Sequence, residues 1–501
     1  MLRRKRSLLG HGTPDNVVKR RQDVGSTQPS PTAVVSSLPT GALSSVSTGG
    51  SLSLPTSTRV PGGLATLSSS RSTSDRTISG TLAPAQAPAR TSKGSKCTPS
   101  PSKTLAPSAT WTTCPYVVRD GKANPDVRTL PDSPAAVEMA QAVLWNAVAF
   151  ALNKKIRSYS QNAANSIDTF FLAPATAMNP NMNYGQQVRG PGKAHQMGSY
   201  TGILDMRGLV KVMNAIALMK AAASPDWTNA RDKAMTAWTK SYISWIENSA
   251  LGKEVATKAN NHFTFYVNQM AAAQMYLGDT QGAQSTLKSY FTHQFLDQIA
   301  ASGEQPFEAV RTRPYHYRCF NLEAMITNAK LADQLGMNVW TAKSKYGATI
   351  QNALDYVMAT DPKGEDISDI FPHVAAIAAA YGDPKGKYAS FLQQKDSGYM
   401  NQPFWFYDQS AALPNSPAGH SKRQLSLSGA AQDLAAYSDA MTGKVVDVAS
   451  AVGSETGAVQ FECPLVFLAA PETELEDGLF VTCDQLKPWY EMPMPVAPEA
   501  L

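Results

Sequence analysis

The sequence predicts an all-α protein built as an α/α toroid, a ring of antiparallel helical hairpins. From about residue 129 to 438, successive stretches carry apolar residues three and four positions apart, which is the spacing of amphipathic helices. Short turns containing Pro or Gly separate these stretches, so neighbouring helices should pack antiparallel. No repeat of fixed period is present, which favours a closed ring over a solenoid.

The elements follow in order along the chain. A capping signal at 132–134 precedes the first predicted helix, 135–156. Further helices are predicted at 204–223, 226–249, 256–277, 280–302, 316–336, 340–360, 368–381 and 384–394. β-branched residues become frequent only at 457–461, 465–468 and 478–482, where we expect a small sheet or hairpin. The chain thus divides into a tail (1–109), a helical domain (110–440) and a C-terminal extension (441–501).

The tail differs from the rest in composition and charge. Residues 1–109 are mostly Ser, Thr, Pro, Gly and Ala, with 14 Lys+Arg against 3 Asp+Glu, whereas the remainder has 31 against 36. Such a segment buries too little apolar surface to offset the entropy of ordering it, so we expect disorder. The tail could bind acidic surfaces nonspecifically, and the alkaline pI is no argument that the domain itself binds a polyanion.

Cysteine usage and hydropathy restrict the remaining classes. None of the five cysteines has metal-ligand spacing; Cys463 and Cys483 could pair in an oxidising compartment or remain free buried thiols. The N-terminus lacks the apolar core of a secretory signal, and no run of about 18 apolar residues occurs. We therefore expect no membrane span.

Two polar clusters stand out within the helical domain. Asn260, Asn261 and His262 precede an aromatic run at the expected start of a helix. They could be an ordinary Asn cap beside a satisfied histidine, or polar groups that point out of a helix N-terminus toward a ligand. The second cluster, at 311–318, packs three arginines, two tyrosines and a histidine into eight residues. A solvated basic turn is the alternative there, and the aromatic content argues against it.

Other segments have weaker functional signals. The stretch 178–192 is a long Asn-rich loop containing an aromatic residue, and its amides suit hydroxyl-rich ligands. Asp205 is expected to cap a helix, and His373 to be a core histidine. The aromatic run 404–407 is either core or a sugar platform, with core favoured.

Together the two clusters suit one reaction, β-elimination from a uronic acid. The enzyme must neutralise the carboxylate, remove the proton at C5 and protonate the departing O4. Asn, Arg and neutral His can serve the first task, Tyr or His the second, and Tyr the third. No metal or other cofactor is required. Glycoside hydrolysis would instead need two facing carboxylates, and the segment offers only Glu304 and Glu308.

These motifs resemble the alginate lyase family, whose fold is the α/α toroid. The resemblance rests on the Asn-Asn-His sequence at 260–262 and on Arg-x-Arg-Pro-x-His-Tyr-Arg-x-Phe-Asn-Leu about 50 residues later. The Asn-rich loop, Phe371-Pro-His-Val-Ala-Ala and Tyr381-Gly-Asp-Pro extend it over about 135–391. The tail and the C-terminal extension are not family features, and the match is closest to a eukaryotic, fungal-type branch.

The resemblance implies roles for named residues. Asn261 and His262 would neutralise the carboxylate with help from Arg311 or Arg313, and Tyr317 would be the acid and could also be the base. Substrate contacts would come from Asn260, Asn181, Asn183, Tyr184, Gln186, Arg189 and His316. The spacing between arginine and tyrosine is about one residue shorter than in the family, which leaves the choice of arginine open.

The function expected is therefore a polysaccharide lyase acting on an acidic, uronate-containing polymer, as a monomer. The family resemblance implies an extracytoplasmic location, although the chain shows no signal peptide. The alternatives are a non-catalytic carbohydrate-binding protein on the same fold and a helical scaffold with a partner-binding tail.

Overall fold

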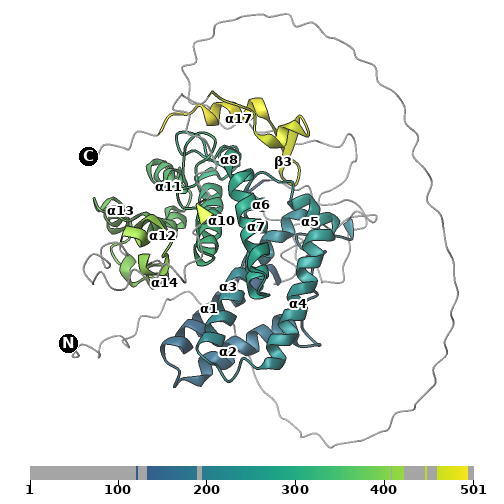
Figure 1. Ribbon diagram of the computed structural model, residues 1–501. Coiled ribbons are helices and arrows are strands. Elements are labelled where there is room, and N and C mark those ends of the chain that lie inside the picture. Colours follow the sequence, from purple (N-terminus) through teal and green to yellow (C-terminus); the bar gives the residue numbers. More distant parts are fainter. Residues whose placement is uncertain are drawn as a thin grey trace, which may run out of the picture. The chain divides into compact units, whose positions relative to one another are not determined.

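The computed structural model describes residues 120–121, 132–188, 195–407, 409–421, 446–447 and 460–494. The predicted tail, Arg189 and residues 457–459 of the β segment predicted at 457–461 lie outside these residues; residues 460–461 of that segment are not in a strand. Within them the protein is mainly helical, as predicted, with short strands only (Figure 1). The strands form a two-residue parallel pair, β1 (Met337–Asn338) with β2 (Val446–Asp447), and an antiparallel hairpin, β3 (Glu472–Glu476) with β4 (Leu479–Thr482).

The main helices form an inner and an outer row. The inner helices are α1 (Asp132–Leu152), α3 (Leu209–Ala221), α6 (Asn261–Tyr276), α10 (Pro314–Gln334) and α12 (Phe371–Tyr381). Each inner helix packs on the next, and α6 and α10 bury most of their residues. The outer helices are α2 (Arg157–Ile167), α4 (Asn229–Asn248), α7 (Thr280–Thr292), α11 (Ile350–Ala359) and α13 (Lys387–Lys395). This paired arrangement is that of an all-α toroid.

Shorter elements connect these rows. They are η2 (Asp168–Leu172), η4 (Tyr200–Met206), α5 (Ala250–Val255), α8 (Gln294–Gln298), α9 (Pro306–Ala309), η5 (Ile367–Ile370), η6 (Tyr399–Asn401), α14 (Pro403–Tyr407), η7 (Ser410–Ala412), η9 (Leu465–Leu468) and α17 (Cys483–Tyr490). Helix α1 is long and apolar enough for a membrane span by composition. It packs on α2 and α3 with Met139, Val143 and Phe150 buried, so no membrane span is indicated.

Several predicted boundaries were wrong for local reasons. The helix predicted at 340–360 begins only at residue 350, because Thr349 and Asn352 form a reciprocal capping box and Gly347 takes a positive φ of 84°. The predicted strand at 465–468 is a 3₁₀ turn that follows Pro464. The predicted helix 280–302 is divided at His293, whose backbone is not helical. Helix α2 was missed because its sequence is mostly polar.

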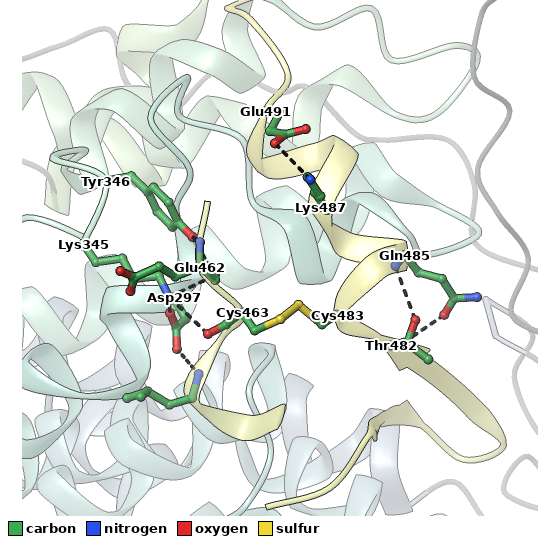
Figure 2. The surroundings of a disulfide bond; sticks show 11 residues. Asp297, Lys345, Tyr346, Glu462, Cys463, Thr482, Cys483, Gln485, Lys487 and Glu491 are labelled. Atoms are coloured by element: carbon green, nitrogen blue, oxygen red, sulfur yellow. Dashed lines mark hydrogen bonds and ion pairs between the residues drawn. A yellow bond between two sulfur atoms is a disulfide. The ribbon is translucent and has the colours of Figure 1, made fainter. Parts of the chain in front are cut away.

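The C-terminal extension is fastened to the helical body. A disulfide joins Cys463 to Cys483, which settles the alternatives left open by the sequence (Figure 2). Near it, the Tyr346 hydroxyl and the Lys345 ammonium both donate to the carbonyl of Glu462, at 3.0 and 3.2 Å. A second hydrophobic cluster, separate from the main core, joins the extension to the loops around α9; its buried members are Ala259, Ala300, Phe307, Val310, Tyr346, Leu475, Val481, Leu486 and Tyr490.

Candidate active site

The first polar cluster lies at the N-terminus of α6. Asn260 occupies the N-cap position with an extended backbone, but its side chain does not cap the helix. Instead its amide donates to the carbonyl of Leu475 at 2.7 Å, and its oxygen faces Nδ1 of His262 at 3.1 Å. Glu308 supplies the cap, because its carboxylate accepts from the backbone N–H and the side-chain amide of Asn261, each at 2.9 Å. The cap is therefore provided by a residue 47 positions away.

His262 is held as a neutral imidazole. Burial lowers its pKa well below the ordinary value, and the charges of Arg311 and Lys258 lower it further. Because the amide of Asn260 is oriented by its bond to Leu475, its oxygen accepts from Nδ1 of His262. Nε2 then carries the lone pair, and it lies 3.8 Å from the carboxylate of Glu476 without a hydrogen-bond partner. This nitrogen can accept a proton.

Arg311 is the central cation of the site and is fully buried. Its guanidinium donates to Asp120 through Nε at 2.9 Å and Nη2 at 2.6 Å, and through Nη2 to Glu476 at 2.8 Å. Its Nη1 lies 3.8 Å from Glu308. Burial raises the pKa of Asp120, but Arg311 and hydrogen bonds from Thr312 outweigh burial and hold that pKa below its ordinary value.

The other carboxylates around Arg311 respond differently. Burial raises the pKa of Glu308 to about 7, although the charge of Arg311 and the hydrogen bonds from Asn261 oppose the rise. Burial likewise raises the pKa of Glu476 to about 7 against the opposing charge of Arg311. The guanidinium of Arg311 therefore forms ion pairs with three carboxyl groups, those of Asp120, Glu308 and Glu476.

Tyr317 lies in the first turn of α10, beside Arg311. The guanidinium carbon of Arg311 is 3.7 Å from the centroid of the Tyr317 ring, which is cation–π contact distance. Burial raises the pKa of the phenol, while the charge of Arg311 lowers it. The resting phenol is therefore protonated and can donate a proton. The structure thus brings Asn261, His262, Arg311 and Tyr317 into one cluster around Glu308 and Glu476.

Two other predicted residues point elsewhere. Arg313 is 47% exposed at its side chain and pairs loosely with Glu365, at 3.9 Å. His316 pairs with Asp369 at 2.7 Å, and its ring stacks on Phe320. Both residues are therefore engaged with the segment that follows α11. The geometry places Arg311 with the tyrosine and leaves Arg313 outside the cluster.

The predicted sugar-binding loop lines a separate cavity of about 530 Å³. Asn181, Tyr184 and Gln186 contribute to its wall, and Tyr184 is 66% exposed. Asn183 does not line it; its side-chain oxygen accepts from the indole N–H of Trp245 at 2.7 Å. The loop packs closely on η4, since a Cβ on Gly185 would lie 2.8 Å from the Cα of Gly202.

Asp205 was expected to cap a helix, and that expectation was wrong. It lies within η4 and accepts from Ser133 at 2.6 Å and from Gln186 at 2.7 Å. Burial raises its pKa, and these hydrogen bonds oppose the rise. Element η4 reaches both regions, because Tyr200 at its start contacts the His262 ring edge-on at 5.4 Å, while Asp205 near its end lines the cavity.

The remaining candidates have structural roles. Glu304 binds Arg318 through both carboxylate oxygens, at 2.7 and 2.6 Å, and is fully buried like Glu308. The pair needed for glycoside hydrolysis is therefore not presented to a cleft. His373 is buried, with its pKa lowered by burial to about 3, as expected for a core histidine. Phe404 and Trp405 pack against the core; the side chains of 406–407 lie outside the description.

The residues that sequence reasoning missed are Asp120, Glu476, Lys258 and Tyr200. Lys258 lies with its ammonium 3.5 Å from the Tyr200 ring centroid and pairs with Glu474 at 3.1 Å. Asp120 and Glu476 reach Arg311 across 191 and 165 residues. The sequence around either acid gives no signal of this role, because the role depends on contact with an arginine far away in the chain.

A body of paired helices that brings amide, imidazole, guanidinium and phenol groups together has the architecture of an α/α-toroid polysaccharide lyase. A family model described as "Alginate lyase" matches residues 79–365, more than half of the chain, so the chain belongs to the alginate lyase family. Among solved structures, it is similar to an alginate lyase from Bacteroides ovatus, with 26% identity and a TM-score of 0.49, over 61% of this chain and 77% of that one. No curated protein was found to match.

Proposed function

We propose that this protein cleaves a uronate-containing, alginate-like polysaccharide by metal-independent β-elimination, leaving a 4,5-unsaturated uronyl end. The observation that carries the proposal is the position shared by Arg311 and His262. Oε2 of Glu476 occupies that position, 2.8 Å from Nη2 of Arg311 and 3.8 Å from Nε2 of His262, and shows that a carboxylate fits between the two groups. The phenol ring of Tyr317 lies against the same guanidinium. A uronate bound there would have its carboxylate neutralised next to a proton donor.

The groups present can carry each step. Arg311, with Asn261 and His262, stabilises the negative charge that spreads into the carboxylate as the C5–H bond breaks. The electron pair forms the C4–C5 double bond and expels O4, which takes the phenolic proton of Tyr317. Two groups compete for the role of base. Nε2 of neutral His262 is available in the resting site. Tyr317 is the second candidate: burial raises the pKa of its phenol and the charge of Arg311 opposes that rise, so in this route the phenol must first lose its proton, then take the C5 proton and pass it to O4.

The second candidate function is carbohydrate binding without turnover. It is favoured by one observation: the side chains of Asn261, His262 and Arg311 have no solvent exposure. Binding by the exposed loop around Tyr184 would not require access to them. For either function we propose an acidic polysaccharide as the partner and an extracytoplasmic location, which the Cys463–Cys483 disulfide supports because disulfides persist in oxidising compartments.

The test is a panel of polymannuronate, alginate and polyglucuronate, monitored by the ultraviolet absorbance of the conjugated product. We expect one polymer to give product with the unmodified protein and Tyr317→Phe to reduce the rate by roughly 10²–10⁴-fold, the usual contribution of a positioned acid or base. The variant retains the ring that contacts Arg311, so folding should be unaffected. Equal rates for both proteins would refute the mechanism, and saturable binding without product would favour the alternative function.

A further inference from the structure

The C-terminal hairpin brings an acidic edge to the candidate active site. Glu472, Glu474, Glu476 and Asp477 lie within β3 and the turn that follows it. The strand is fixed in place, because Leu475 is fully buried and its carbonyl accepts from Asn260. In Figure 1 the hairpin lies beside the start of α6. A segment outside the helical domain therefore supplies carboxylates to the site.

One of these carboxylates occupies the position that the proposed reaction requires. Glu476 is bonded to Nη2 of Arg311 at 2.8 Å and lies 3.8 Å from Nε2 of His262. Its own side chain is 17% exposed, whereas those of Arg311 and His262 have no exposure. A uronate carboxylate can reach these two groups only after Glu476 withdraws.

The charges argue that Glu476 and a substrate cannot be bound together. Arg311 already serves Asp120 and Glu308 as well as Glu476, and Asp477 lies close enough to raise the pKa of Glu476. An additional carboxylate on the same buried guanidinium would be strongly repelled, because charges interact more strongly away from water. Lys258 does not relieve this repulsion at Arg311, since it is paired with Glu474 and Glu254.

We propose that Glu476 is an affinity-determining residue that competes with substrate, its side chain standing in for the uronate carboxylate on Arg311 and His262. The inference rests on the proposed function. The backbone of β3 is anchored by Leu475 and by the disulfide, so the competing movement is a rotation of the Glu476 side chain away from Arg311, and the hairpin remains docked.

The experiment compares Glu476→Gln with Glu491→Gln in the full chain. At pH 8, above the pKa of about 7 that burial gives Glu476, both variants remove a negative charge from the extension. Glu491 is an exposed residue after α17 that pairs only loosely with Lys487, at 3.8 Å. The measured quantities are the Kd for mannuronate oligosaccharides by calorimetry and the KM for polymannuronate. We expect Glu476→Gln to lower both roughly tenfold, since a charge-assisted hydrogen bond to Arg311 is weakened, and Glu491→Gln to leave both unchanged.

The outcomes separate the inference from the function on which it rests. If Glu476→Gln has a Kd equal to or higher than that of the wild type while the wild type has lyase activity, the proposed competition is refuted and the proposed function is not. Absence of binding to oligosaccharides and of product from every polymer of the panel, in all three proteins, overturns the proposed function as well. Glu476→Ala serves as a second variant, with thermal unfolding to confirm that it is folded. Weaker binding by folded Glu476→Ala would assign the carboxylate a role in holding substrate and would also overturn the competition.

Discussion

The two arginines at the start of α10 offer a matched test of how the site is built. Arg311→Leu removes a buried cation that makes two hydrogen bonds to Asp120 and one to Glu476. The carboxylates of Asp120, Glu308 and Glu476 would then share a buried space without that cation. Removing one partner of a buried ion pair costs about 3–5 kcal/mol, so the melting temperature should fall by the order of 10 °C.

Arg313→Leu is the control. Its side chain is half-exposed and its partner Glu365 is 3.9 Å away. Such a surface pair contributes about 0–1 kcal/mol, so the melting temperature should hardly change. The lyase rate, measured well below either melting temperature, should fall by about 10²–10³-fold for Arg311→Lys, which keeps the charge but loses the planar fork, and should be unaffected in Arg313→Leu. This reasoning would be refuted if Arg311→Leu were as stable as the wild type, or if Arg313→Leu lost more of the lyase rate than Arg311→Lys.

Two further predictions concern stability. The pKa of Glu308, about 7 in the folded protein against an ordinary 4.5, favours its protonated form, so its contribution to stability is fully present below about pH 4.5 and is lost as the pH rises through 7. The free energy of unfolding of the wild type, measured relative to that of Glu308→Gln, should therefore fall by about 3 kcal/mol as the pH rises across this range. If urea unfolding gives the same difference between the two proteins at pH 4.5 and at pH 8, the raised pKa of Glu308 is refuted. Replacing both Cys463 and Cys483 by Ser opens a cross-link of sequence separation 20, which in the chain-entropy account contributes about 3 kcal/mol. We expect faster hydrogen exchange in 460–494 with α6 and α10 unchanged; exchange equal to that of the wild type would contradict this.

The helical part of the fold was predictable because burial repeats with helical spacing in the outer helices: α4 buries Met235, Trp238, Tyr242 and Ile246, and α7 buries Ala283, Leu287 and Tyr290. The inner helices α6 and α10 are buried on most sides and follow this spacing less closely. Boundaries were less predictable, since they depend on single contacts. The start of α6 shows why: the sequence suggested an Asn cap, but the cap comes from Glu308, and Asn260 is used to orient His262. A local sequence window does not contain that information.

The candidate site was predictable where its chemistry is concentrated in short segments. Asn261, His262, Arg311 and Tyr317 belong to two clusters of unusual composition, and the structure brings those clusters together. The sequence could not distinguish Arg313 from Arg311. The two arginines are two positions apart just before a helix, and the sequence does not show which of the two side chains points into the protein. The structure separates them through partners: Arg311 meets Asp120 and Glu476, whereas Arg313 meets Glu365.

The extension becomes part of the site through Arg311, and this has a thermodynamic consequence. The same guanidinium that would neutralise a uronate also holds Glu476, and Asn260 ties the backbone of β3 to His262. Under the proposed competition, Glu476 weakens oligosaccharide binding by some factor, and linkage requires a bound oligosaccharide to weaken the Glu476–Arg311 contact by the same factor. Because Leu475 and the disulfide hold the strand in place, the coupling free energy between substrate and Glu476 involves the movement of that one side chain only. The hairpin can therefore set the affinity of the site without leaving it.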